Sequence, residues 1–165
     1  MIRKHKTYVR PKKAYEKSRM EEENKIAEKY GLKNKREIWK TIAKVSYFRR
    51  RAKALAKSSN EEQEVLFNKL QNLGLKVNSI ADVLALNVEN LLNRRIQTVL
   101  LHKKLANTIK HARQMIVHRK VMINGSIVTT PSYLVSVEDE NTLSLKKENK
   151  TPKIVKKEEN SEVNA

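Results

Sequence analysis

Apolar residues recur every three or four positions over much of the chain, which predicts helices with one buried face. The first helix is expected from Glu21 to Tyr30, where Gly31 ends it. A second helix starts at Asn34, because an asparagine followed three residues later by Glu37 is an N-cap and capping-box signature. The apolar stripe of this second helix consists of Ile38, Ile42, Val45, Ala52 and Leu55.

The middle of the chain repeats the helix-start signal twice. Asn60 with Gln63, and Ser79 with Asp82, have the spacing at which an N-cap residue and a first-turn residue bond each other. The helix after Asn60 is expected to end at Gly74. Its leucine-rich face predicts a structural core that supports the more charged elements.

From residue 87 the pattern predicts two further helices. Asn87 can cap a helix that continues to Leu100 and leaves Arg94 and Arg95 outside its apolar stripe. Thr108 can cap the next helix. On that helix the buried face is Ile109, Ala112 and Ile116, and a different face carries Lys110, Arg113 and Gln114.

The hydrophobic pattern then becomes alternating. A short strand from Lys120 leads into Asn124 and Gly125, and a second strand follows them. Asn-Gly between short apolar runs is a strong hairpin signal, because both central residues of a type I′ turn need positive φ. A further strand is expected through residues 133–137, and the acidic residues 138–140 are expected to stay solvated in a turn.

These signals together predict an α+β fold, with a mostly helical N-terminal domain and a small helix-helix-β-hairpin module. The expected division is a basic arm at 1–20, a helical domain at 21–87, the module at 88–145 and a tail at 146–165. The tail is rich in lysine and glutamate and has almost no apolar residues. It is therefore expected to be disordered, or ordered only by a partner.

The charge of the chain points to a polyanionic partner. The 165 residues include 36 Lys and Arg against 18 Asp and Glu, a formal net charge of +18. Residues 1–57 carry net +14, residues 58–87 net −2, residues 88–145 net +4 and residues 146–165 net +2. Such an excess repels itself unless a polyanion neutralises it, so nucleic acid is the expected partner. Phosphate contact is favoured over a merely solvated face for the run Arg49, Arg50 and Arg51.

Other chemistries are not indicated. The chain has no cysteine, which excludes disulfides, thiolate zinc sites and iron–sulfur clusters. Its histidines lack metal-binding spacing, and three glycines cannot build a phosphate-cradling loop. We therefore expect no catalytic residue, no metal and no cofactor. No uncharged run approaches the roughly 20 residues of a membrane helix, so no membrane partner is expected.

Several motifs carry a family resemblance. A double arginine opens the region 92–140, HARQMIVH follows in its second helix, and INGSIV and PSYLVS come after it. This region resembles the RNA-binding domain named after small-subunit ribosomal protein S-four. GLKNKREIWK at 31–40 and ADVLALNVENLLNRRIQT at 81–98 are similar to the archaeal and eukaryotic branch of the S-four ribosomal protein family. The resemblance therefore covers most of the chain.

The resemblance implies an RNA-facing surface that contacts phosphates and 2′-hydroxyls. Its members are Arg94, Arg95, Lys103, Lys104, Lys110, Arg113, Gln114, His118 and Lys120. The family usually has His-Gly where this chain has His118 and Arg119. Glycine tolerates a left-handed backbone, so Arg119 either is strained or shifts the turn.

The resemblance also implies a function. By this resemblance, the protein would be a structural constituent of the small ribosomal subunit. It would bind the 5′ domain of the small-subunit RNA, nucleate assembly and lie near the channel where mRNA enters. Its partners would be small-subunit ribosomal RNA, neighbouring ribosomal proteins and mRNA, and its location cytoplasmic. One alternative is a nucleolar processing-complex protein that binds precursor RNA. Another is an accessory module of an RNA-modifying enzyme, although no catalytic domain fits in this chain.

Overall fold

The computed structural model describes residues 5–146, and it has the expected α+β architecture. The N-terminal helices are α1 (Lys17–Lys29), α2 (Lys35–Leu55), α3 (Asn60–Asn72), α4 (Ile80–Ala85) and α5 (Val88–Asn93). They are followed by α6 (Ile96–His102), α7 (Ile109–Val117), β1 (Val121–Ile123), β2 (Ser126–Ile127), α8 (Val137–Thr142) and β3 (Ser144–Leu145). The tail predicted at 146–165 lies outside the described residues except for Lys146, as do residues 1–4 of the predicted arm.

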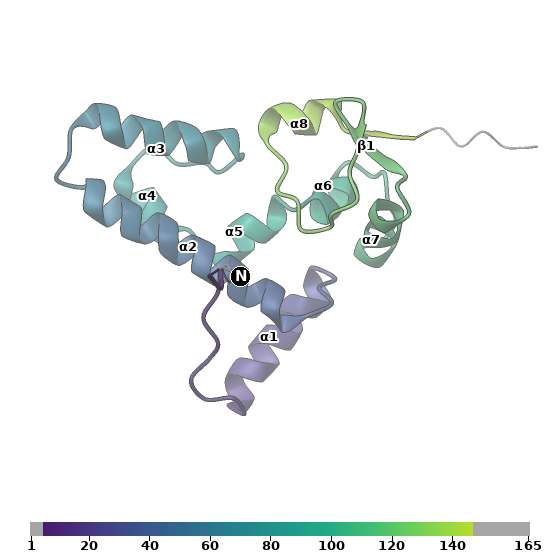
Figure 1. Cartoon of the computed structure of the whole chain (residues 1–165), viewed down its shortest axis with the longest axis horizontal. Coiled ribbons are helices and arrows are strands. Elements are labelled where there is room, and N and C mark those ends of the chain that lie inside the picture. Colours follow the sequence, from purple (N-terminus) through teal and green to yellow (C-terminus); the bar gives the residue numbers. More distant parts are fainter. Residues whose placement is uncertain (1–4, 147–165) are drawn as a thin grey trace, which may run out of the picture.

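The long helix α2 is the axis of the N-terminal half. Helices α3 and α4 lie along one end of it, α1 crosses near its start, and α5 leads away toward the C-terminal half (Figure 1). The stripe predicted on α2 is right except at Ile42, which is 43% exposed, and Phe48 is buried in addition. The core at this end consists of Val45, Phe48, Ala52, Leu66, Leu70, Leu75, Val77, Val83, Leu86 and Leu91.

A second core lies in the C-terminal half, where α6 packs on α7 beside a small sheet (Figure 1). The sheet is antiparallel, with strand order β2-β1-β3. The predicted Asn-Gly hairpin is confirmed, with φ of 50° at Asn124 and 78° at Gly125. Leu91 belongs to the first core and Ile96 to the second, so the two cores meet between α5 and α6.

The single helix predicted from residue 88 to Leu100 is wrong. The chain leaves helical geometry at Arg95, where ψ is 143°, and α5 and α6 are separate helices. The reason is pairing with a distant segment. The Ile96 N–H donates to the Tyr133 carbonyl at 3.0 Å, and the Val135 N–H donates to the Arg94 carbonyl at 3.0 Å.

The strand predicted through residues 133–137 is not formed. Of this segment only Leu134 forms a bridge, to Arg95, and Val137 already starts α8. The third strand of the sheet is β3 instead. The Ser136 side chain accepts a hydrogen bond from the Asp139 N–H and so caps α8, which explains why the acidic residues form a helical turn.

The predicted helix starts have mixed outcomes. The capping box of Ser79 and Asp82 is present, and Thr108 accepts from the His111 N–H at 3.1 Å. Asn34 and Asn87 occupy N-cap positions without a side-chain bond to the helix. The third helix starts one residue earlier than predicted, with Ser59 as its N-cap. Asn60 is its first residue.

Two turns after helices have a residue in the left-handed backbone region. Gly31 ends the first helical region with φ of 58°, and Arg119 has φ of 59°, so Arg119 takes the strained left-handed conformation.

In the described part of the chain, no helix combines the length and the apolar composition needed to span a bilayer.

Candidate nucleic-acid interface

The face of α7 that points to solvent, with the turn after it, carries four of the nine predicted RNA-facing residues of the C-terminal half. Lys110 and Gln114 are exposed on the helix, and His118 and Lys120 are exposed just after it. Gln114, His118 and Lys120 also line a shallow notch of about 260 Å³, together with His111 and Met115. The other face of α7 is buried in the core through Ala112, Met115 and Ile116. The exposed polar side chains of α7 are therefore held on a rigid element.

Lys103 and Lys104 lie at the end of α6. Lys104 is exposed and has φ of 56°, an unusual conformation for a lysine. The Lys103 ammonium donates to the backbone carbonyl of Glu140, which ties the end of α6 to α8. Of the two lysines, Lys104 is therefore the one with a side chain directed to solvent.

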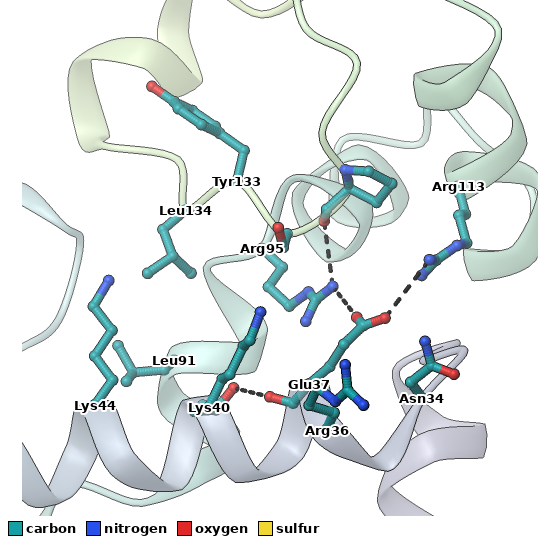
Figure 2. A pocket seen from close by; sticks show the side chains of 13 residues that line it. Asn34, Arg36, Glu37, Lys40, Lys44, Leu91, Arg95, Arg113, Tyr133 and Leu134 are labelled. Atoms are coloured by element: carbon teal, nitrogen blue, oxygen red, sulfur yellow. Dashed lines mark hydrogen bonds and ion pairs between the residues drawn. The ribbon is translucent and has the colours of Figure 1, made fainter. Parts of the chain in front are cut away.

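The helical pattern predicted that Arg95 lies on an exposed face, and this prediction is wrong. Its side chain is only 5% exposed, and its Nη2 atom lies 2.6 Å from Oε2 of Glu37 on α2. The same nitrogen donates to the carbonyl of Pro131 at 3.5 Å. The other oxygen of Glu37 lies 3.6 Å from Nη2 of Arg113, so one carboxylate joins α2 to both arginines (Figure 2).

This position of Glu37 explains why it does not complete a capping box with Asn34. The carboxylate turns to the two arginines and lines a groove between α2 and the segment before α8. The groove has a volume of about 650 Å³. Its cationic residues on α2 are Arg36, Lys40 and Lys44.

Arg94 is also directed inward. Its guanidinium donates to the Val135 carbonyl at 3.1 Å and lies 2.8 Å from a carboxylate oxygen of Glu140. The prediction that the acidic residues 138–140 stay solvated in a turn is therefore wrong for Glu140. Arg94 stabilises the chain segment that follows the hairpin.

Asp139 is held in a polar network as well. It accepts hydrogen bonds from the Tyr133 hydroxyl at 2.8 Å and the Asn124 amide at 3.2 Å. The bond from Tyr133, with the Ser136 cap, holds the pKa of Asp139 below its ordinary value. The same bond raises the pKa of Tyr133. The hairpin turn is thereby attached to the start of α8.

The three consecutive arginines of α2 divide between two roles. Arg49 donates to the Leu86 carbonyl at 2.6 Å and so fixes α2 to the end of α4. Arg50 and Arg51 are exposed, and Arg51 donates to the hydroxyl of Tyr47 at 3.3 Å. Only Arg50 and Arg51 thus present their charge at the surface.

Further cations on α2 were absent from the predicted site residues. Arg36, Lys40 and Lys44 are exposed and spaced four residues apart, so they share one side of the helix with Arg51. The N-terminal arm lies on this helix, because the ring of Tyr8 is 6.1 Å from that of Trp39. The i, i+4 spacing of the cations was the sequence signal for this surface.

The C-terminal half and most of the whole chain match known proteins. Residues 94–141 match the family described as the S4 domain. A protein of Thermoplasma volcanium named small ribosomal subunit protein uS4 is 41% identical over 149 residues, which cover 85% of this chain and 74% of that relative. The protein of the same name from Methanococcus aeolicus is 40% identical over 146 residues, or 84% of this chain and 82% of the relative. The chain belongs to the uS4 family.

Membership of the uS4 family confirms the resemblance found in the sequence. The S4 domain of this uS4 chain starts at Arg94, where α5 ends, and continues into α8. It therefore includes α7 with its exposed polar face. The groove beside Glu37 lies where the S4 domain meets α2.

Proposed function

We propose that this uS4 family member is a structural constituent of the small ribosomal subunit and binds its RNA directly. The observation that carries the proposal is the exposed face of α7 in an S4 domain, with Lys110 and Gln114 on the helix and His118 and Lys120 just after it. Two archaeal relatives of about 40% identity bear the name of a small-subunit ribosomal protein, which supports the assignment.

The chemistry of the α7 face suits A-form RNA. The major groove of an RNA duplex is deep and narrow, so proteins contact its phosphates and 2′-hydroxyls. Lys110 supplies a charge for a phosphate, and the Gln114 amide can both donate to and accept from a 2′-hydroxyl. Recognition on this face is therefore by backbone shape rather than by base sequence.

A second contact is proposed on α2, where Arg36, Lys40, Arg50 and Arg51 are exposed. Arg94, Arg95 and Arg49 have a different role in this proposal, since their guanidinium groups bond protein atoms. Arg95 joins the S4 domain to α2 through Glu37. Arg94 stabilises the S4 domain itself, and Arg49 joins α2 to the end of α4. In this proposal Arg95 therefore helps to hold the S4 domain and α2 in the relative position from which the two surfaces bind one RNA.

The finer assignments are part of the same proposal. We place the RNA contact in the 5′ domain of the small-subunit RNA, where binding early in assembly would nucleate folding of that domain. In the finished subunit the protein would lie near the channel where mRNA enters, beside other ribosomal proteins, in the cytoplasm. It would act by binding and would catalyse no reaction. The names of the relatives support this assignment over a processing protein that binds only precursor RNA.

Lys110→Ala tests the α7 face. We expect weaker binding of the full chain to small-subunit ribosomal RNA transcribed in vitro, and a salt dependence whose slope falls by about 0.9, the value for one phosphate contact. The measurement is the binding constant at several salt concentrations. Lys76→Ala removes an exposed lysine between α3 and α4 and serves as the matched control. Equal slopes for Lys110→Ala and the unsubstituted chain would contradict the assignment.

A further inference from the structure

Three grooves meet at one lysine of α2. Lys44 lines the groove beside Glu37, a groove of about 570 Å³ between α2 and the N-terminal arm, and a groove of about 700 Å³ between α2 and α3. Tyr47, one turn further along the helix, lines the last two of these. Lys44 and Tyr47 therefore form a ridge with a hollow on each side.

The aromatic ring on this ridge is both exposed and firmly placed. Tyr47 is 46% exposed, and its ring packs at 5.7 Å against the buried ring of Phe48. Arg51 donates to its hydroxyl at 3.3 Å, which also lowers the pKa of Tyr47. The Tyr47 ring is thus exposed on one side, packed on Phe48 and bonded at its hydroxyl by Arg51. Such a fixed, exposed ring is suited to stack on a planar group.

Two lysines face the groove between α2 and α3 from its opposite walls. Lys44 comes from α2 and Lys69 from α3. Partial desolvation of the Lys44 ammonium in the groove and the charge of Lys69 both lower the pKa of this otherwise exposed lysine. Among the described residues 5–146, neither lysine forms an ion pair with a carboxylate. Two cations that repel each other across a hollow are stabilised by an anion placed between them.

We propose that this ridge binds one unpaired nucleotide of RNA, with its base stacked on Tyr47 and its phosphate between Lys44 and Lys69. The proposal rests on the proposed RNA-binding function and names the form of RNA that this part of α2 takes. The amides of Asn68 and Asn72 line the same groove and can bond the edge of a base.

The charge around the groove is what selects RNA as the occupant. Lys40 and Arg50 line the arm groove on the other side of the ridge, so a nucleotide chain crossing the ridge meets cations on both sides. A duplex cannot use the site, because its bases are stacked on each other and their faces are covered. A nucleotide in a loop or a bulge presents both a free face and a phosphate.

Tyr47→Ala tests this site with two RNA probes, a single-stranded oligouridylate of about 12 nucleotides and an RNA duplex of about 16 base pairs. Stacking on one aromatic ring corresponds to an affinity difference of about tenfold. We expect Tyr47→Ala to weaken single-strand binding by about that factor and to leave duplex binding unchanged. Tyr47→Phe keeps the ring and should bind both probes as the unsubstituted chain does.

Lys69→Ala adds an independent readout. It should lower the salt slope of single-strand binding by about 0.7, the value for one phosphate of a single strand. Unchanged single-strand affinity in Tyr47→Ala would overturn the proposal and leave the groove to a protein partner. An equal loss on both probes would also overturn it.

The outcomes separate the two proposals. If Lys110→Ala weakens duplex binding while Tyr47→Ala has no effect, the RNA-binding function stands and the nucleotide site fails. If Tyr47→Ala acts as expected while Lys110→Ala changes nothing, the α7 face fails instead. If the unsubstituted chain binds neither probe, both proposals fail.

Discussion

Glu37→Ala should lower the free energy of unfolding by about 3 kcal/mol, the lower end of the range for removing one partner of a buried ion pair. The substitution leaves the guanidinium of Arg95, which is 5% exposed, with no carboxylate. It also removes the ion-pair partner of Arg113. Because Glu37 joins α2 to α6 and α7, the loss should appear as weaker association of the two halves of the chain.

Urea unfolding measures this loss, and a double variant that combines Glu37→Ala with Arg95→Met identifies its cause. With both charges removed, the site has no uncompensated buried ion, so the double variant should be more stable than Glu37→Ala alone. Glu21→Ala removes an exposed carboxylate from α1 and should change stability by less than about 0.5 kcal/mol. A double variant less stable than Glu37→Ala would show that the pair does not act through the buried charge.

Gly31→Ala should destabilise the protein by about 2 to 4 kcal/mol, the sum of a left-handed backbone and an overpacked contact. Gly31 has φ of 58°, and a Cβ atom there would lie 2.5 Å from Cγ2 of Ile109. The close approach brings the end of α1 against the start of α7. The substitution therefore forces both the turn and the contact between the two halves.

Gly125→Ala separates these two costs. Gly125 has φ of 78° in the hairpin turn, and a Cβ atom there would meet nothing within 4 Å. Its substitution should cost only the backbone strain of about 1 to 2 kcal/mol. Chemical denaturation of both variants gives the difference, which measures the steric part at Ile109. Equal losses in the two variants would mean that Ile109 moves aside without cost.

Local signals in the sequence were sufficient for several elements. The Ser79–Asp82 capping box, the Thr108 cap and the Asn124-Gly125 hairpin each depend on residues within three positions of one another. Such interactions form with little dependence on the rest of the chain. The pattern of α7 likewise placed Lys110 outside the core, because 3.6-residue periodicity decides which side of a helix is buried.

Elements that depend on distant residues could not be predicted in this way. The apolar spacing from residue 88 to Leu100 continues through Arg95 without interruption, but the backbone there bonds residues about forty positions later. Glu37 has the spacing of a capping residue and instead pairs with Arg95 and Arg113. Nothing in the neighbouring sequence indicates these partners, so the inward direction of Arg94 and Arg95 required the structure.

Sedimentation of the endogenous protein tests the central claim most directly, that this uS4 family member is a stable RNA-bound part of the small ribosomal subunit. A cell extract is separated on a sucrose gradient, and the protein is detected in each fraction. We predict that it migrates with free small subunits and with translating ribosomes, and that high salt releases part of it because phosphate contacts weaken with salt. Confinement to precursor particles, or migration with the free proteins at the top of the gradient, would contradict the account.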